Sequence, residues 1–128
     1  MVPVVRDADQ LSLLALAGEI RALADAARNG SAGREQLTGS TITITSLGPL
    51  GGIMNTPLLN PPEVTVVGVN KIEVRPMWNG SSFVPRSVMN VSASFDHRII
   101  DGWEAAVFVQ RIKRLLETPA LLTLDWTR

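Results

Sequence analysis

The part of this sequence with the richest potential chemistry is the run from Phe95 to Gly102, which contains the only histidine of the 128 residues. Histidine side chains titrate near pH ~6.5, so an imidazole can take up and return a proton at neutral pH. Asp96 precedes His97 and Asp101 follows it by four positions. The pattern allows a general base at His97, but composition alone favours a structural histidine that is hydrogen-bonded in a turn.

Two predicted elements position this run. Residues 91–95 alternate apolar and small polar side chains, as a half-buried strand does. The following segment has apolar side chains at helical spacing and predicts a helix from about Gly102 to Glu117, with Asp101 as its N-cap. The apolar positions are Ala105, Phe108, Val109, Ile112, Leu115 and Leu116. His97 is therefore expected just beyond the end of a strand.

The string Asp-His-Arg-Ile-Ile-Asp-Gly resembles the D-H-R-x-x-D-G signature of the dihydrolipoamide acyltransferases, the core components of 2-oxo-acid dehydrogenase complexes. Chloramphenicol acetyltransferase is a structural cousin of that family. Further landmarks of the family appear in the expected order at residues 2–9, 37–48, 60–63, 78–80 and 83–86. The whole chain, residues 1–128, thus resembles the C-terminal portion of one acyltransferase catalytic domain. Residues 48–54 and 70–76 look closest to the branched-chain members.

The resemblance implies a role for each residue of the signature. His97 would take the proton from the thiol of coenzyme A or dihydrolipoamide, and the thiolate would attack a thioester carbonyl directly. Asp101 would form an ion pair that holds the histidine loop, with an arginine from the first half of the domain. Asp96 and Arg98 would shape the loop, and Gly102 would permit a tight entry into the final helix.

The family also supplies a hydroxyl group that stabilises the oxyanion, at the end of the strand before a glycine-rich loop. The resemblance places Thr45 at that position. Ser46 is a second candidate, although strand alternation points it to the opposite face. An ordinary β-branched strand residue is the alternative interpretation of Thr45.

Family resemblance further implies how the chain assembles and what it binds. The active site would lie between subunits of a homotrimer, so that His97 and Thr45 meet in trans, and trimers could build a larger core. Coenzyme A would be a substrate, no cofactor would be tightly bound, and the lipoyl group would come from another domain. The decarboxylase and dihydrolipoamide dehydrogenase components would bind through lipoyl and subunit-binding domains that this chain lacks.

Composition excludes several other classes of protein. Twelve basic and twelve acidic residues give no excess charge for nucleic acid or an anionic membrane. Without cysteine and with one histidine, disulfides and thiolate or histidine-rich metal sites are ruled out, so no metal is expected. No run of eighteen apolar residues or signal peptide is apparent. A cytoplasmic protein is expected, or one of the mitochondrial matrix in a eukaryote.

The pattern along the chain predicts an α/β fold of two layers, with a mixed β-sheet and helices on one face, as a partial chloramphenicol acetyltransferase-like domain. Expected strands cover residues 2–5, 40–46, 64–77 and 83–95, with a hairpin turn at Asn79-Gly80. A helix capped by Asp7 or Asp9 is expected to end at Asn29-Gly30. Residues 47–52 form a glycine-rich turn, 53–62 a surface excursion, and 121–124 a short apolar tail.

The sequence supports two candidate functions and argues against two others. The first is acyl transfer between dihydrolipoamide and coenzyme A, and the second is a core-assembly fragment of the same protein without activity of its own. A peptide-condensing domain of the wider superfamily would carry histidine where Asp96 stands. A serine hydrolase would need a G-x-S-x-G string, which is absent.

Overall fold

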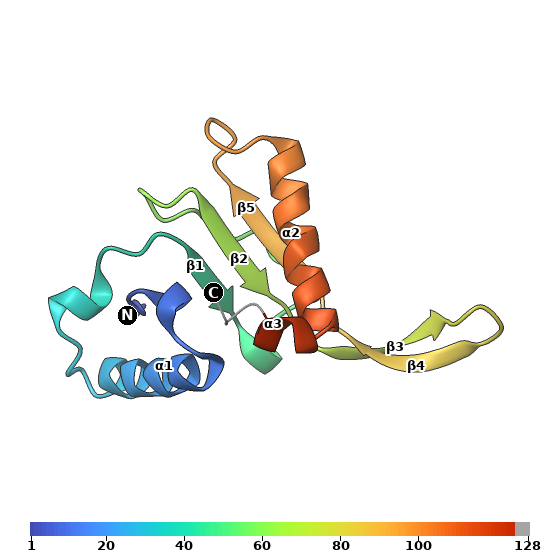
Figure 1. Cartoon of the computed structure of the whole chain (residues 1–128), viewed down its shortest axis with the longest axis horizontal. Coiled ribbons are helices and arrows are strands. Elements are labelled where there is room, and N and C mark those ends of the chain that lie inside the picture. Colours follow the sequence, from blue (N-terminus) through green and yellow to red (C-terminus); the bar gives the residue numbers. More distant parts are fainter. Residues whose placement is uncertain (125–128) are drawn as a thin grey trace. The chain divides into compact units, whose positions relative to one another are not determined.

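The computed structural model describes residues 1–124 (Figure 1). They divide into two compact units, the first with residues 1–40 and 123–124 and the second with residues 41–122. Each unit is described by itself. The first unit is helical, and the second contains all five strands of the described chain.

The first unit is built around the helix α1, Leu13–Arg28, with short 3-10 turns η1, Ala8–Gln10, and η2, Arg34–Leu37. The helix begins at Ser12, whose hydroxyl oxygen accepts from the Ala15 N–H at 3.2 Å. The predicted cap at Asp7 or Asp9 is therefore wrong. Asp7 instead has a left-handed φ of 46° and precedes η1. The predicted end at Asn29 is confirmed.

The predicted strand at residues 2–5 is also wrong. The segment makes one backbone hydrogen bond, from the Val4 N–H to the Gln36 carbonyl at 2.8 Å, and no ladder. Arg6 ties it further to η2, because its guanidinium donates to the carbonyls of Glu35 and Thr38, both at 2.8 Å. Residues 2–5 are apolar, but no described strand lies beside them, so they form no β-ladder.

The second unit contains a mixed three-stranded sheet in the order β1-β2-β5, with β1 at Thr43–Ser46, β2 at Thr65–Val69 and β5 at Val91–Phe95. Strand β1 runs parallel to β2, and β5 runs antiparallel to it. One row across the sheet therefore joins Thr45, Gly68 and Ser92. The expected strand at residues 40–46 is confirmed in its second half.

A separate two-stranded hairpin pairs β3, Glu73–Trp78, with β4, Phe83–Val88. Asn79 shapes its turn as predicted, since its Oδ1 accepts from the N–H groups of Ser81 and Ser82, both at 2.9 Å. The continuous strands predicted over 64–77 and 83–95 are wrong. Each is divided into two strands that belong to different sheets.

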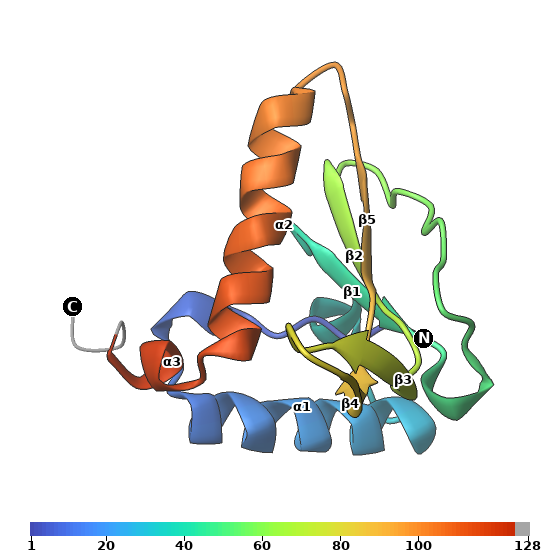
Figure 2. The same ribbon diagram turned by 90° about the vertical axis from the view of Figure 1, so that its right-hand side faces the viewer.

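The helix α2, Gly102–Glu117, has the predicted bounds and lies along β5 (Figures 1 and 2). The rings of Phe95 on β5 and Phe108 on α2 meet edge to face, with 6.1 Å between their centroids. The end of the chain predicted as an apolar tail is helical: α3 covers Ala120–Leu124. The predicted fold class, a mixed sheet with α2 on one face, is confirmed.

The core is small for a chain of this length. Among the described side chains the buried apolar ones are Leu23, Val66 and Val67, the last two on the central strand β2. Large apolar side chains such as Trp103, Phe83 and Ile44 are each at least 70% exposed. None of the helices within residues 1–124 has the length and apolar character needed to span a bilayer.

Candidate active site

His97 lies in the loop that joins β5 to α2, at one end of the sheet (Figure 1). The loop backbone is well anchored: the Asp96 N–H donates to the Val64 carbonyl at 2.9 Å, and the Asp96 carbonyl accepts from Ile99 and Ile100, both at 3.0 Å. His97 itself is exposed. Within residues 1–124 its imidazole makes no hydrogen bond, so both ring nitrogens are open to a substrate or a second chain.

Asp96 and Arg98 pair with each other within the loop. The Asp96 carboxylate accepts from the Arg98 backbone N–H at 3.0 Å, from Nε at 2.9 Å and from Nη2 at 2.6 Å. These bonds from the Arg98 side chain and backbone lower the pKa of Asp96 from 3.8 to about 2. Asp96 is therefore ionised at neutral pH and fully engaged by Arg98.

Asp101 is the N-cap of α2, as its position predicts. Its Oδ1 accepts from the Glu104 N–H at 2.8 Å and so satisfies one of the free donors at the start of the helix. No arginine pairs with it within residues 1–124, and the ion pair implied by resemblance stays a prediction. Gly102 has open space at its Cβ position and no positive φ. Nothing in this backbone therefore requires a glycine there.

Thr45 is half-buried on β1. Phe95 contacts α2 and pairs with Thr65, so Gly68, three residues after Thr65, faces away from the helix. Thr45 pairs with Gly68 and therefore lies on the face opposite to α2, whereas Ile44 alternates to the other side. Its hydroxyl makes no hydrogen bond within the described part of the chain. Ser46 is exposed, and its Oγ accepts from the Gly48 N–H at 3.1 Å. Thr45 thus has the free hydroxyl, and Ser46 is engaged in the turn.

One chain does not bring Thr45 and His97 together. Thr45 lies in a row with Ser92, and His97 is five residues further along β5 and its loop. Phe95, the last strand residue before the loop, is three positions beyond Ser92, or about 10 Å along the strand, and β2 separates β1 from β5 by about another 10 Å. The arrangement separates the candidate base from the candidate hydroxyl donor.

Asn55 was missed by the sequence analysis, which assigned it to a surface excursion. Its carboxamide lies directly over Gly68, since a Cβ built on that glycine would be 2.2 Å from Asn55 Oδ1. Asn55 therefore joins the row of Thr45 and Ser92 from outside the sheet. No periodicity or motif marks it, and only the tertiary fold brings it there.

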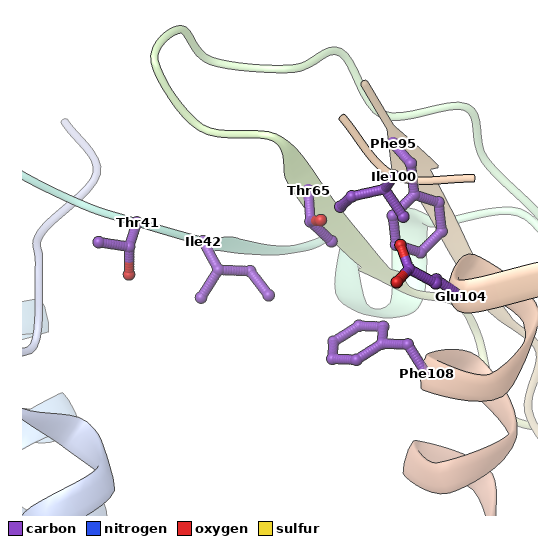
Figure 3. Close-up of a pocket in the computed structure, with 7 residues that line it drawn as sticks. All are labelled: Thr41, Ile42, Thr65, Phe95, Ile100, Glu104 and Phe108. Atoms are coloured by element: carbon purple, nitrogen blue, oxygen red, sulfur yellow. The ribbon is translucent and has the colours of Figure 1, made fainter. Parts of the chain in front are cut away.

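A hollow of about 300 Å³ lies under α2 on the other face of the sheet. Phe95, Ile100 and Phe108 line it together with Ile42, which directly precedes β1, and Glu104 adds a carboxylate (Figure 3). None of the predicted site residues lines this hollow. Within residues 1–124 no three acidic, histidine or cysteine side chains gather as metal ligands would.

The exposed histidine on the strand-to-helix loop and the free strand hydroxyl are the two candidate catalytic groups of this chain. Comparison with known proteins identifies the family: residues 1–124 match the catalytic domain of the 2-oxoacid dehydrogenase acyltransferases, and the chain belongs to this family.

Named relatives support the same assignment. The chain is 56% identical over 125 residues to the lipoamide acyltransferase component of the branched-chain alpha-keto acid dehydrogenase complex of Pseudomonas putida. The match covers 98% of this chain and 30% of that relative.

Two solved structures share the fold. One, of Azotobacter vinelandii dihydrolipoamide acetyltransferase, addresses the role of a serine, a histidine and an asparagine in catalysis, with 44% identity and a TM-score of 0.89. The other is the cubic core of a pyruvate dehydrogenase multienzyme complex, with 43% identity and a TM-score of 0.90. Each match covers 96% of this chain and 51% of the solved chain.

Proposed function

We propose that this chain contributes the catalytic histidine and the oxyanion-binding hydroxyl of an acyltransferase that moves an acyl group between dihydrolipoamide and coenzyme A. The observation that carries the proposal is His97, exposed on an anchored loop within a sequence that belongs to the acyltransferase family. The chain spans about half of the solved catalytic domains, so we regard it as the C-terminal portion of one.

His97 removes the proton from the attacking thiol, and the thiolate sulfur forms a bond to the thioester carbonyl carbon. Negative charge moves onto the carbonyl oxygen, where the Thr45 hydroxyl donates a hydrogen bond. The tetrahedral intermediate then breaks its bond to the leaving sulfur, which takes the proton back from His97. No acyl-enzyme forms, and His97 ends in its starting protonation state.

The Azotobacter structure supports these assignments by spacing. The interval from its serine to its histidine equals the interval from Thr45 to His97, and its asparagine follows the histidine by the interval that separates Asp101 from His97. Threonine keeps the hydroxyl of that serine. Asp101 keeps an oxygen acceptor of that asparagine but adds a charge.

The distance between Thr45 and His97 favours a site shared by two copies of the chain. We propose a homotrimer in which His97 of one subunit faces Thr45 of the next, and in which trimers can build a larger core, as in the cubic relative. Symmetric assemblies of this kind repeat one interface at every site.

Substrates and partners follow from the same family. Coenzyme A is a substrate rather than a bound cofactor, and the lipoyl group arrives on another domain. A branched-chain acyl group is favoured, because identity is 56% to the branched-chain relative and 44% to the acetyltransferase. Decarboxylase and dihydrolipoamide dehydrogenase components would bind through other domains. A cytoplasmic location, or the mitochondrial matrix in a eukaryote, fits these partners.

An assembly fragment without activity of its own is the second candidate function. It is favoured by the large apolar side chains that remain uncovered, including Trp103 at 79% and Trp78 at 59% exposure. Surfaces of this kind mark contacts with other chains or domains.

Acyl transfer from isobutyryl-, acetyl- and succinyl-coenzyme A to free dihydrolipoamide tests the proposal. We expect activity with a preference for the branched donor, and at least a 100-fold lower kcat in His97→Ala. Ile99→Ala, an exposed apolar change in the same loop, is the matched control. A folded oligomer without activity would reject the proposal in favour of the assembly fragment.

A further inference from the structure

Asn55 occupies a defined place on the sheet face that carries Thr45. Its carboxamide lies over Gly68, and a Cβ on that glycine would be 2.2 Å from Oδ1 and 2.8 Å from Nδ2. No side chain larger than hydrogen fits under the amide. The glycine thus leaves the space that the Asn55 side chain fills.

The backbone that leads into Asn55 is held in place. The Asn55 N–H donates to Ser92 Oγ at 3.3 Å, and the same oxygen accepts from Asn70 Nδ2 at 3.0 Å. Asn90 Nδ2 donates to the Ile53 carbonyl at 2.7 Å. These bonds anchor the backbone of segment 53–55 to β5 and to the end of β2, and the close approach to Gly68 restricts the carboxamide itself.

The two ends of the carboxamide differ. Oδ1 is buried against the sheet and has no hydrogen-bond partner. Nδ2 lies 2.8 Å from the Cβ position of Gly68 and donates to no group within residues 1–124. Asn55 therefore carries two N–H donors that no described group uses, on an anchored segment.

Thr45 and Gly68 are direct neighbours on adjacent strands. Neighbouring strands lie about 4.8 Å apart, so the backbone under the amide and the backbone that carries the Thr45 hydroxyl are separated by about that distance on one face of the sheet. Two donors at this separation can each approach one oxygen atom to about 3 Å. The geometry suits a single negatively charged oxygen between them.

We infer that Asn55 is a second oxyanion donor, which binds the carbonyl oxygen of the thioester through Nδ2 beside the Thr45 hydroxyl. This inference rests on the proposed acyl transfer. An asparagine amide is one of the side chains that form oxyanion holes, and it acts most strongly when it is fixed before reaction. The hydrogen bonds of Ser92 and Asn90 to the backbone, together with packing of the amide on Gly68, restrict its position in this way.

Asn55→Asp and Asn55→Ala test the inference, since the first removes both donors at nearly constant volume and the second removes the amide. We expect kcat to fall by about 10- to 1000-fold, the usual effect of losing one oxyanion donor, with KM within about 2-fold of the unchanged chain. Gln110→Glu on the exposed surface of α2 is the matched amide-to-acid control and should keep full activity.

The possible results distinguish the Asn55 inference, the oxyanion site as a whole and the proposed function. Unchanged kcat in both Asn55 variants, together with a reduced kcat in Thr45→Val, overturns the Asn55 inference alone. Unchanged kcat in Thr45→Val overturns the oxyanion site as a whole, and an inactive unmodified chain overturns the proposed function with it. Thermal unfolding identifies any variant that lost its fold. Asn55→Ser, which keeps a small polar side chain, replaces such a variant and is expected to show the same loss of kcat.

Discussion

Asp96 and Arg98 form an ion pair across the histidine between them, with 2.6 Å between Oδ2 and Nη2. The Asp96 side chain is 15% exposed and that of Arg98 is 88% exposed. Because Arg98 occupies the carboxylate, Asp96 is not available to orient the His97 imidazole. The pair links the two residues that flank His97, and we expect any group that orients the imidazole to come from outside this pair.

Asp96 gives the fold a specific dependence on pH. Its folded pKa of about 2 lies below the ordinary value of 3.8, so its stabilising effect is complete above about pH 5 and is lost as the pH falls through 3.8 towards 2. Asp96→Asn should lower the thermal unfolding midpoint at pH 7 and flatten its decline between pH 5 and 2. Asp25→Asn, in an exposed ion pair with Arg28, is the control. Parallel midpoint curves for Asp96→Asn and the unchanged chain would contradict this account.

Two substitutions at Asp101 separate its role as a helix N-cap from the effect of its charge. Asp101→Ala should lower the free energy of unfolding by about 1 kcal/mol, the usual cost of losing an N-cap, whereas Asp101→Asn keeps the cap. Urea unfolding measures both effects. If the ion pair implied by resemblance forms in the assembled protein, Asp101→Asn loses activity although its stability is preserved. Equal destabilisation by both substitutions would contradict the capping role.

Gly68 and Asn55 should be coupled in stability. Gly68→Ala forces a methyl group into the Asn55 amide, and overpacking of this kind costs about 1–3 kcal/mol. In an Asn55→Ala background the space is free, so most of that cost should disappear. A double-mutant cycle of unfolding free energies measures the coupling. Additive effects of the two substitutions would show that the amide does not lie over the glycine.

Local patterns were sufficient to predict much of this fold. Gly102–Glu117 has both a helical apolar pattern and an N-cap aspartate, and the helix forms with those bounds. The turn at Asn79 follows from local side-chain chemistry, since Oδ1 accepts from the backbone two and three residues later. Elements whose signals are contained within a few neighbouring residues are read correctly from the sequence.

Errors occurred where distant contacts decide the structure. The run 64–77 looks like one strand, but the Asn70 backbone and side chain both donate to the Asn90 carbonyl, at 3.2 and 3.0 Å, and the chain leaves the sheet there. Residues 2–5 are apolar but have no neighbouring strand. Asn55 reaches the site only through its bond to Ser92, 37 residues away. No local pattern encodes such partners.

Complementation between two inactive variants tests most directly whether His97 and Thr45 act in trans. We would co-refold His97→Ala and Thr45→Val chains in equal amounts and measure acyl transfer beside each variant alone. Sites that pair the intact His97 of one variant with the intact Thr45 of the other should restore about a quarter of the activity of the unmodified protein. If the mixture stays as inactive as its parts while forming mixed oligomers, the two residues do not act across subunits and the account is wrong.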